Sequence, residues 1–254
     1  MAIKTYQKGS KEKLSDNFYV SEFACHGSGC CGIVKIDEQL VSYIQKIRNH
    51  FGKPVTVNSG YRCTTHNANI GGANGSRHTK GQAADIAVKD VAPAEVAKYA
   101  ESIGILGIGL YETAKDGYFV HIDTRTKKSF WYGQSEEYRS TFGGNSAYYT
   151  KSDFVKDVQK AIGAFVDGIA GNETMTKTVT VSEKFNCAHA VVRPIQMRLS
   201  ALDYSDVGVA DGIAGKKFTE ALSKFQSDNG CAPTGTAEAW GKTWHKLFSV
   251  ERKY

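Results

Sequence analysis

The first regular hydrophobic pattern lies between residues 36 and 52. Its apolar positions recur at intervals of three and four, at Ile36, Leu40, Ile44 and Ile47. This spacing places them on one side of an α-helix, with polar residues on the other. We therefore predict an amphipathic helix over residues 36–52.

Between residues 54 and 104 the hydrophobic pattern changes from that of a strand to that of a loop, a second strand and a helix. Residues 54–62 alternate like a strand that runs into a turn, whereas residues 64–77 are rich in Asn and Gly and predict an irregular loop. Residues 83–88 (AADIAV) predict a second strand. Residues 92–104 predict a helix with Pro93 in its first turn.

Two short apolar runs follow, at residues 105–112 and 118–125, separated by TAKDG. Two such runs on either side of a short polar segment with Gly are typical of a β-hairpin. Helices mixed with antiparallel strands favour the α+β class. We therefore predict an α+β domain over residues 1–130.

Residues 131–152 are aromatic and polar without a period, and we interpret them as a linker. Beyond it the chain repeats itself, because residues 158–179 are echoed by residues 195–222, with DGIAG in both. A repeat of this kind predicts paired helix–loop–helix units. We therefore expect a small all-α domain over residues 153–254, with repeats at 153–192 and 193–250.

Length, charge and hydropathy argue against a nucleic-acid-binding protein and against a membrane-spanning protein. The chain has 254 residues, enough for about two domains, and a net charge of +6 without basic clusters, so nucleic-acid binding is not expected. No apolar run reaches about 18 residues, so no membrane-spanning segment is expected. Residues 1–17 do not have the pattern of a signal peptide. We therefore expect synthesis in the cytoplasm, with an extracytoplasmic substrate reached only after release, for example by lysis.

The candidate chemistry lies in two segments, SRHTKGQAADIAV and FVHIDTR. His78 and Asp85 are seven residues apart, and His121 lies in the second predicted strand of the hairpin. Two imidazoles and one carboxylate leave one position open on a tetrahedral zinc ion, which is the pattern of a catalytic site. An ordinary hydrogen-bonded His–Asp pair is the alternative that spacing alone leaves open.

A resemblance to a known family favours the metal. The stretch from Ser76 to Asp85, with S-x-H-x6-D and Gly and Ala inside, resembles the signature of the D-alanyl-D-alanine carboxypeptidase and endopeptidase family of zinc peptidases. The similarity extends upstream to SGYR (59–62) and downstream to H-x-D at His121. The segment LSDNFYVSEFAC (14–25) is typical of phage and prophage lysins of this family. The resemblance covers most of residues 14–126, and it implies the fold that this family shares with the hedgehog signalling domain.

The resemblance also implies roles for individual residues. It makes His78, Asp85 and His121 the ligands of a zinc ion. It makes Arg62 the arginine that binds a substrate carboxylate or stabilises developing negative charge. Ser76 is a candidate for a hydrogen bond to substrate, with a turn-forming role as the alternative.

The general base is where the chain departs from better-known members. Many carry Glu or Asp three residues before the last histidine ligand, and others carry His two residues before it. Here those positions are Tyr118 and Phe119, and neither accepts a proton near neutral pH. Of the nearby carboxylates Glu112, Asp116 and Asp123, we favour Asp123 because alternation in a strand places it on the face of His121. Support of a ligand is the competing role for Asp123.

Four of the six cysteines cluster in the first quarter of the chain: Cys25, Cys30, Cys31 and Cys63. They are consistent with a disulfide, a second structural zinc ion, or free thiols, and the sequence does not separate these states. Cys187 and Cys231 are predicted to be single buried thiols.

The C-terminal repeats resemble the three-helix peptidoglycan-binding module. Residues 193–250 match this pattern well, and residues 153–192 match only through VQKAIG and VDGIAGNET. The alternative is a generic helical domain. In either case we expect the following residues to form the core: Leu222, Phe225, Trp240, Trp244 and Leu247.

Together these features predict a modular, monomeric zinc peptidase of the endolysin type. It would cut peptidoglycan peptides that contain D-amino acids, and its C-terminal domain would bind the wall. A carboxypeptidase that trims terminal D-alanine is the alternative among enzymes. A wall-binding protein without catalytic activity is the alternative from another class.

Overall fold

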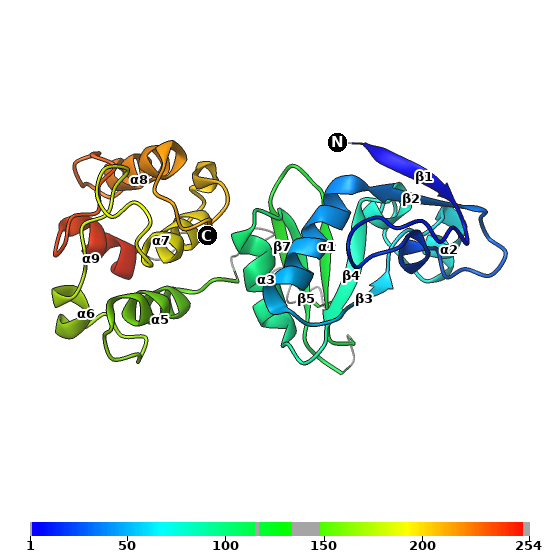
Figure 1. Ribbon diagram of the computed structural model, residues 1–254, viewed down its shortest axis with the longest axis horizontal. Helices are drawn as coiled ribbons and strands as arrows, with labels where there is room; N and C mark the ends of the chain where they lie inside the picture. The colour runs from blue at the N-terminus through cyan, green and yellow to red at the C-terminus, as the bar shows by residue number, and fades with distance from the viewer. Residues whose placement is uncertain (1, 115–116, 134–147, 251–254) are drawn as a thin grey trace. The chain divides into compact units, whose positions relative to one another are not determined.

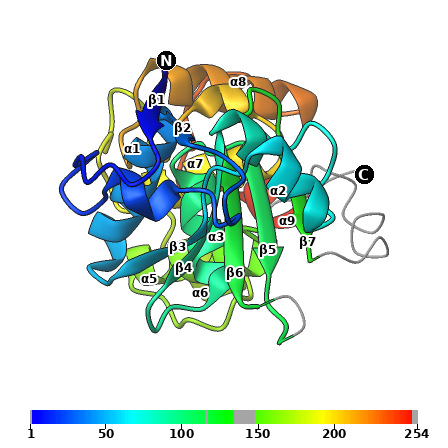
Figure 2. The ribbon, with the colours of Figure 1, turned by 90° about the vertical axis from the view of Figure 1, so that its right-hand side faces the viewer.

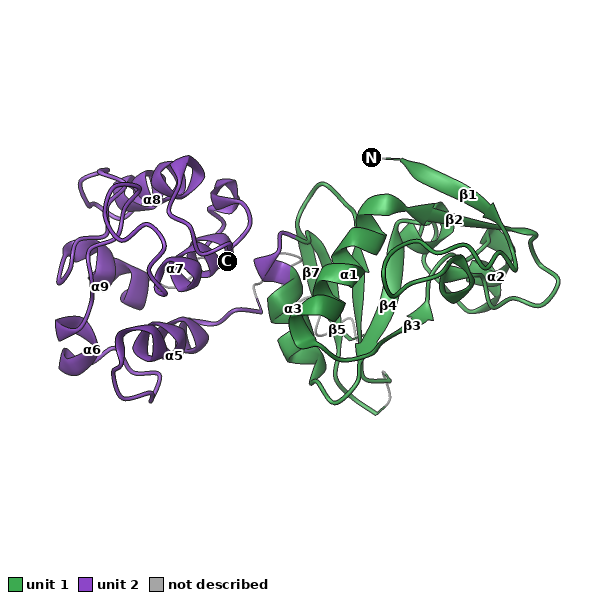
Figure 3. Cartoon of the chain, viewed as in Figure 1, with its two compact units in different colours: residues 1–100, 105–146 green, residues 101–104, 147–254 purple. Residues whose placement is uncertain are grey.

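The computed structural model describes residues 2–114, 117–133 and 148–250. The chain divides into two compact units, shown in Figure 3. Unit 1 comprises residues 1–100 and 105–146, and unit 2 comprises residues 101–104 and 147–254. The chain has the expected mixed α+β composition, with all named strands before residue 133.

A five-stranded sheet forms the centre of unit 1 (Figure 2). Its order is β3-β4-β6-β5-β7, and the strands are β3 (Val55–Ser59), β4 (Ala83–Val88), β6 (Phe119–Asp123), β5 (Gly107–Tyr111) and β7 (Ser129–Tyr132). All neighbours are antiparallel except β5 and β7, which are parallel. The predicted hairpin is confirmed as β5 and β6.

The helix predicted over residues 36–52 is α1 (Glu38–Phe51), which packs against β4. It begins two residues later than predicted because Asp37 is its N-cap, with a side chain that accepts a hydrogen bond from the Gln39 N–H. Ile36 instead belongs to β2 (Ile33–Asp37), which pairs with β1 (Ile3–Gln7) in a separate two-stranded sheet. The predicted helix over residues 92–104 is confirmed as α3 (Pro93–Ser102).

Two boundaries differ from the sequence prediction. The irregular loop predicted over residues 64–77 is partly wrong, because α2 (Thr64–Asn69) forms there after the N-cap residue Cys63. The predicted linker is shorter than residues 131–152. Strand β7 reaches Tyr132 and α5 already starts at Lys151, whereas linker residues 134–147 lie outside the described part of the chain.

The register of the sheet aligns one row of residues across four strands. Asp85 pairs with His121, His121 with Gly109, and Gly109 with Trp131. Since side chains alternate along a strand, the members of such a row lie on the same face. The neighbouring row faces the opposite side and is buried: Ala84, Ile122, Ile108 and Phe130. One face of the sheet is therefore core, and the other carries the polar residues.

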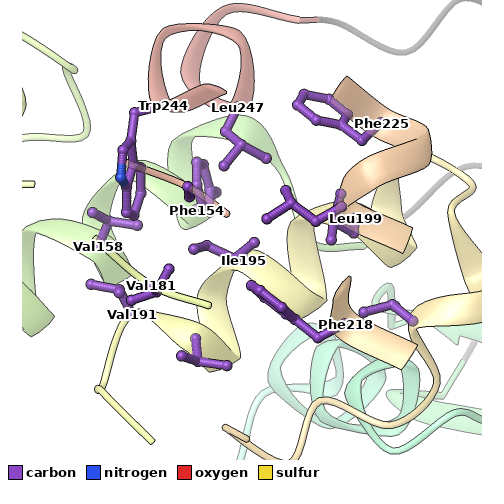
Figure 4. Close-up of a cluster of buried hydrophobic side chains, with 14 of the residues drawn as sticks. Phe154, Val158, Val181, Val191, Ile195, Leu199, Phe218, Phe225, Trp244 and Leu247 are labelled. Atoms are coloured by element: carbon purple, nitrogen blue, oxygen red, sulfur yellow. The ribbon is translucent and has the colours of Figure 1, made fainter. Parts of the chain in front are cut away.

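Unit 2 contains only helices among its named elements (Figure 1). They are α5 (Lys151–Ile162), α6 (Asn172–Thr176), α7 (Val192–Ala201), the short 3₁₀ helix Ser205–Val207, α8 (Lys216–Asp228) and α9 (Lys242–Ser249). Figure 4 shows their shared core, in which Phe154, Ile195, Phe218 and Trp244 interlock. None of the described helices in either unit is both long and apolar enough to cross a membrane.

Most of the predicted core of unit 2 is confirmed. Leu222, Phe225, Trp244 and Leu247 are fully buried. The prediction for Trp240 is wrong, because its side chain is 59% exposed. The cysteine prediction is also wrong in this unit: Cys187 is exposed and Cys231 is half-buried.

The predicted helix–loop–helix repeat is built on a buried glutamine. In each repeat, a glutamine near the middle or end of a helix accepts a hydrogen bond from the N–H of a glycine in the following loop. The pairs are Gln159 with Gly168 at 2.9 Å, Gln196 with Gly212 at 2.8 Å, and Gln226 with Gly235 at 2.8 Å. The three glycines have φ of 77°, 82° and 68°, a conformation that side chains disfavour. The structure thus contains three copies of a unit that the sequence showed twice.

Candidate metal centre

The three predicted ligands come from three different elements. His78 lies in the short 3₁₀ helix Arg77–Lys80, Asp85 lies in the middle of β4, and His121 lies directly opposite Asp85 in β6. The turn before His78 is fixed by Ser76, which is the N-cap and accepts a hydrogen bond from the His78 N–H. Gly81 ends the turn with φ of 73°, and a Cβ there would lie 2.3 Å from the Lys35 carbonyl oxygen. This turn therefore requires glycine at position 81.

The donor atoms of these residues converge. His78 Nε2 lies 3.2 Å from His121 Nδ1, and Asp85 Oδ1 lies 2.9 Å from His121 Nδ1 and 3.4 Å from His78 Nε2. Donors about 2.0–2.1 Å from a tetrahedral zinc ion are about 3.3 Å apart. The three atoms therefore already have the spacing of three corners of such a site.

The hydrogen bonds on the far side of each ring show which nitrogen is available. His78 Nδ1 lies 2.7 Å from the Gly60 carbonyl oxygen, which only accepts, so Nδ1 carries the proton and Nε2 keeps its lone pair. His121 Nε2 lies 3.3 Å from Asp123 Oδ2, which leaves Nδ1 as the free nitrogen of the neutral ring. When both rings are neutral, two nitrogen lone pairs and a carboxylate oxygen thus face one point, where a bound cation relieves their repulsion. The residues present fit a bound metal.

Arg62 contacts the ligand set directly. Its Nη2 donates to Asp85 Oδ2 at 2.5 Å, and its Nε donates to Ser59 Oγ at 2.7 Å. The carboxylate therefore has one oxygen for Arg62 and the other for the metal position. Burial alone would raise the pKa of Asp85, but in the metal-free protein hydrogen bonds with the His121 and His78 rings outweigh it and hold the pKa well below its usual range.

Asp123 lies on the other side of His121 from the metal position. Its side chain is fully buried, and its two oxygens accept hydrogen bonds from the Arg125 guanidinium, the Arg125 N–H and His121 Nε2. Burial alone would raise the pKa of Asp123, but the hydrogen bonds from His121 and Arg125 outweigh it and hold the pKa low. Asp123 is thus placed to orient His121. It is not among the described residues that line the cleft.

A cleft of about 440 Å³ opens over the ligands. Three arginines line it, Arg62, Arg77 and Arg125, and Asp85 is the only carboxylate among the described lining residues. Trp131 forms part of the wall, with its ring centroid 5.1 Å from that of His121 and its Nε1 donating to the Tyr111 hydroxyl at 3.0 Å. Arg62 is paired with Asp85 and Arg125 with Asp123, so the excess positive charge of the cleft comes from Arg77, and Trp131 makes one side aromatic.

Of the remaining predicted site residues, Ser76 lines the cleft and Glu112 does not. Ser76 lines the cleft as well as capping the 3₁₀ helix, so both roles predicted for it are compatible with its position. Glu112 is exposed and is not among the described lining residues. Asp116 lies outside the described residues.

Sequence reasoning missed the residues that complete the row beside His121. Trp131 falls within the predicted linker, and no role is predicted for Gly107 or Gly109. A Cβ at Gly109 would lie 2.4 Å from the Trp131 ring, and a Cβ at Gly107 would lie 2.1 Å from the Asp123 carboxylate. Glycine in a strand interior often marks such a close approach, so the pattern G-I-G was the available signal.

Comparison with known proteins agrees with this geometry. Residues 16–123 match the family described as Peptidase M15. Residues 188–239 match the peptidoglycan binding domain family. The chain is 43% identical over 70 residues to the zinc D-Ala-D-Ala carboxypeptidase of Streptomyces albus G, a stretch that covers 26% of this chain and 28% of that protein.

A second relative is the peptidoglycan L,D-endopeptidase MepK of Escherichia coli K12, which is 36% identical over 99 residues. This match covers 36% of the chain and 53% of MepK. The chain thus spans about a quarter to a half of the length of these curated relatives. On these matches, the chain contains a region, residues 16–123, that matches Peptidase M15 and a C-terminal region, residues 188–239, that matches the peptidoglycan binding domain family.

Proposed function

We propose that this protein is a zinc-dependent peptidase that hydrolyses peptide bonds in bacterial peptidoglycan. The observation that carries the proposal is the convergence of His78 Nε2, Asp85 Oδ1 and His121 Nδ1 at the floor of an open cleft. Two relatives support it, one named a zinc D-Ala-D-Ala carboxypeptidase and the other a peptidoglycan L,D-endopeptidase.

The cleft side chains have distinct roles in this proposal. A zinc ion held by His78, Asp85 and His121 would lower the pKa of a water molecule and polarise the scissile carbonyl. Arg62 holds Asp85 in place and presents its guanidinium to the cleft, where it suits the developing negative charge or a peptide carboxylate. Asp123 fixes the tautomer of His121 through Nε2, so that Nδ1 faces the metal.

The charge of the cleft supports an anionic peptide as substrate. Arg62, Arg77 and Arg125 line it; Arg62 is paired with Asp85 and Arg125 with Asp123, so Arg77 supplies the excess positive charge. Peptidoglycan stem peptides carry free carboxylates, which guanidinium groups bind in bidentate fashion. The arginines therefore favour these peptides over neutral ones.

The proton acceptor is a separate part of the proposal. We infer that Asp123 supports a ligand and does not act as the base, because both of its oxygens are occupied and its side chain is fully buried. Glu112 and Asp116 remain the carboxylates that the sequence offers. Glu112 precedes His121 by nine residues along the chain, and Asp116 precedes it by five.

Unit 2 suits a wall-binding role in this scheme. Its exposed apolar residues include Ile169 and Ile213, which occupy the same position in the two DGIAG loops. The lysin-like segment at residues 14–25 favours an endolysin that reaches the wall after release from the cell. A carboxypeptidase that trims stem peptides is the second candidate, since one relative bears that name.

Digestion of purified peptidoglycan followed by mass spectrometry of the products tests the proposal. We expect cleaved cross-links or stems from the full chain and none from His78→Ala, with His245→Ala, an exposed histidine of unit 2, as the matched control. Release of free D-alanine alone would indicate the carboxypeptidase. Wall binding without any product, by a chain that contains zinc, would indicate a binding protein and refute the proposal.

A further inference from the structure

A second group of possible metal ligands lies outside the cleft. Cys25, Cys30, Cys31 and Cys63 place their Sγ atoms within 4.8 Å of one another. None of them forms a disulfide in the structure. They share no residue with the His78, Asp85 and His121 set, so this cluster is a distinct feature of unit 1.

The spacing of the sulfur atoms is that of a tetrahedral thiolate site. Cys25 Sγ lies 3.6 Å from Cys30 Sγ, which lies 3.8 Å from Cys31 Sγ. Four sulfurs about 2.3 Å from a zinc ion are about 3.8 Å apart. A disulfide would instead hold two of these sulfurs about 2.05 Å apart.

The surrounding backbone supports sulfur atoms that carry negative charge. The Cys63 N–H donates to Cys25 Sγ at 3.4 Å, and the His66 N–H donates to Cys63 Sγ at 3.3 Å. Hydrogen bonds of this kind orient and stabilise metal ligands. The loop is also shaped for the cluster, because a Cβ at position 27 would lie 2.3 Å from Cys30 Sγ, so only glycine leaves room for that thiol.

We propose that Cys25, Cys30, Cys31 and Cys63 bind a second zinc ion, which is structural because four protein ligands leave no open position. This ion would fasten the loop of residues 25–31 to the start of α2. Cys63 directly follows Arg62, whose guanidinium holds Asp85. The second ion therefore stabilises the segment that carries Arg62, without taking part in the reaction.

Metal analysis of the full chain, purified under reducing conditions with zinc, tests the stoichiometry. We expect two zinc ions per chain in the unchanged protein, one in His78→Ala, and one in Cys30→Ser. Cys231→Ser, a half-buried cysteine of unit 2, is the matched control and should keep two. If Cys30→Ser keeps the zinc content of the unchanged protein, the second site does not exist.

Cobalt substitution gives an answer that does not depend on the folding of any cysteine variant. Thiolate ligands give Co²⁺ an intense charge-transfer absorption in the near ultraviolet, whereas a site made of two histidines and an aspartate gives none. We expect this absorption in the unchanged protein and in His78→Ala, with four of the six thiols protected from modification until a chelator is added. A cobalt-loaded chain without that absorption, or an intact mass that shows these cysteines joined in disulfides, would overturn the proposal. Failure of His78→Ala to lose activity would affect the proposed peptidase function alone.

Discussion

His121 uses its two ring nitrogens for different tasks. Nδ1 faces Asp85 and His78, and Nε2 faces the buried carboxylate of Asp123. A carboxylate in this position sets the tautomer and makes the other nitrogen a better ligand. Asp123 could orient His121 in this way or act as the general base, and an experiment can separate these two roles.

We expect Asp123→Asn to weaken zinc binding by about 10–100-fold, because the histidine loses its orienting partner. Competition with a chromophoric chelator measures the affinity, and hydrolysis at saturating zinc measures the chemistry. A variant that binds zinc normally but is inactive would instead identify Asp123 as the base.

The matched comparison uses the other two candidates, Glu112→Gln and Asp116→Asn. Neither change should alter zinc affinity. Loss of hydrolysis with full zinc content in one of them would identify that residue as the proton acceptor. Full activity in both would remove these carboxylates as candidates.

Zinc affinity should also depend on pH through His121. Burial alone would lower the pKa of His121, but hydrogen bonds to Asp123 and Asp85 outweigh it and raise the pKa above 6.5. The protonated ring therefore stabilises the metal-free fold fully below about pH 6.5, and this contribution is lost as the pH rises through the raised value. Zinc needs the neutral ring, so its affinity has the opposite dependence and falls as the pH is lowered through that value.

The expected slope for one competing proton is about tenfold per pH unit below the raised pKa. Asp85 does not add to this competition in the same range, because its pKa is held well below its usual value. Chelator competition between pH 8 and pH 5.5 measures the slope. A constant affinity over this range would contradict the assignment of Nδ1 as a ligand.

Gly109 is predicted to be intolerant of a side chain. A Cβ there would lie 2.4 Å from the Trp131 ring, which forms the wall of the cleft beside His121. We expect Gly109→Ala to destabilise unit 1 by about 1–3 kcal/mol, as overpacking does elsewhere. Gly32→Ala, where a Cβ meets nothing within 4 Å, is the control for denaturant unfolding and should be nearly neutral. Equal stability of the two variants would mean that Trp131 moves aside freely.

These residues also show what the sequence reveals about a site. His78, Asp85 and His121 are a motif with characteristic spacing, and the structure brings their donor atoms together. Trp131 and Gly109 become neighbours of His121 only through the pairing of β5 with β6 and β7. That pairing is non-local, and the parallel partner β7 carries no motif of its own. The chemistry was therefore readable from the sequence, but its surroundings were not.

At the scale of elements, the glutamine-to-glycine hydrogen bonds organise unit 2. Gln196 accepts a hydrogen bond from the Gly212 N–H and donates to Asp211 Oδ1 and the Ile213 carbonyl oxygen. One buried side chain thus forms hydrogen bonds to three groups of the loop. We expect Gln196→Ala to destabilise unit 2 by about 1–3 kcal/mol, because it leaves buried polar groups unpaired. The loop of residues 211–215 should also lose protection in hydrogen exchange. The control is Glu220→Ala on the exposed face of α8, which should change stability by less than about 0.5 kcal/mol.

Local patterns predicted elements well where one face of the element is buried. The stripe in α1 and the alternation in β4 were sufficient, since each follows from its own residues. Strand β1 is not predicted because it is largely exposed, and the end of β2 is assigned to the helix because Ile36 continues the apolar stripe of α1. Helix α2 was missed because a Cys63 side chain, and not a residue typical of helix starts, provides its cap. The third repeat was missed because its loop lacks DGIAG, although Gln226 and Gly235 keep the hydrogen bond.

At the scale of the whole molecule, the proposed function assigns the reaction and the binding of the wall to the two regions that match different families. Every residue assigned to the metal centre lies in the region that matches Peptidase M15, residues 16–123, or within eight residues after it, as Arg125 and Trp131 do. Residues 188–239 belong to the peptidoglycan binding domain family. A tethered binding module raises the local concentration of an enzyme at an insoluble substrate without changing its chemistry.

This division predicts the effect of removing unit 2. A chain that ends at residue 133 retains strands β1 to β7, the three metal ligands and the four clustered cysteines. We expect it to hydrolyse soluble muropeptides at the rate of the full chain, but to digest intact walls roughly a hundredfold more slowly at low enzyme concentration. Because the deficit comes from local concentration, it should shrink as more enzyme is added. Zinc content equal to that of the full chain confirms that the shortened chain is folded. An equal loss on both substrates at all concentrations would show that unit 2 contributes to the reaction itself.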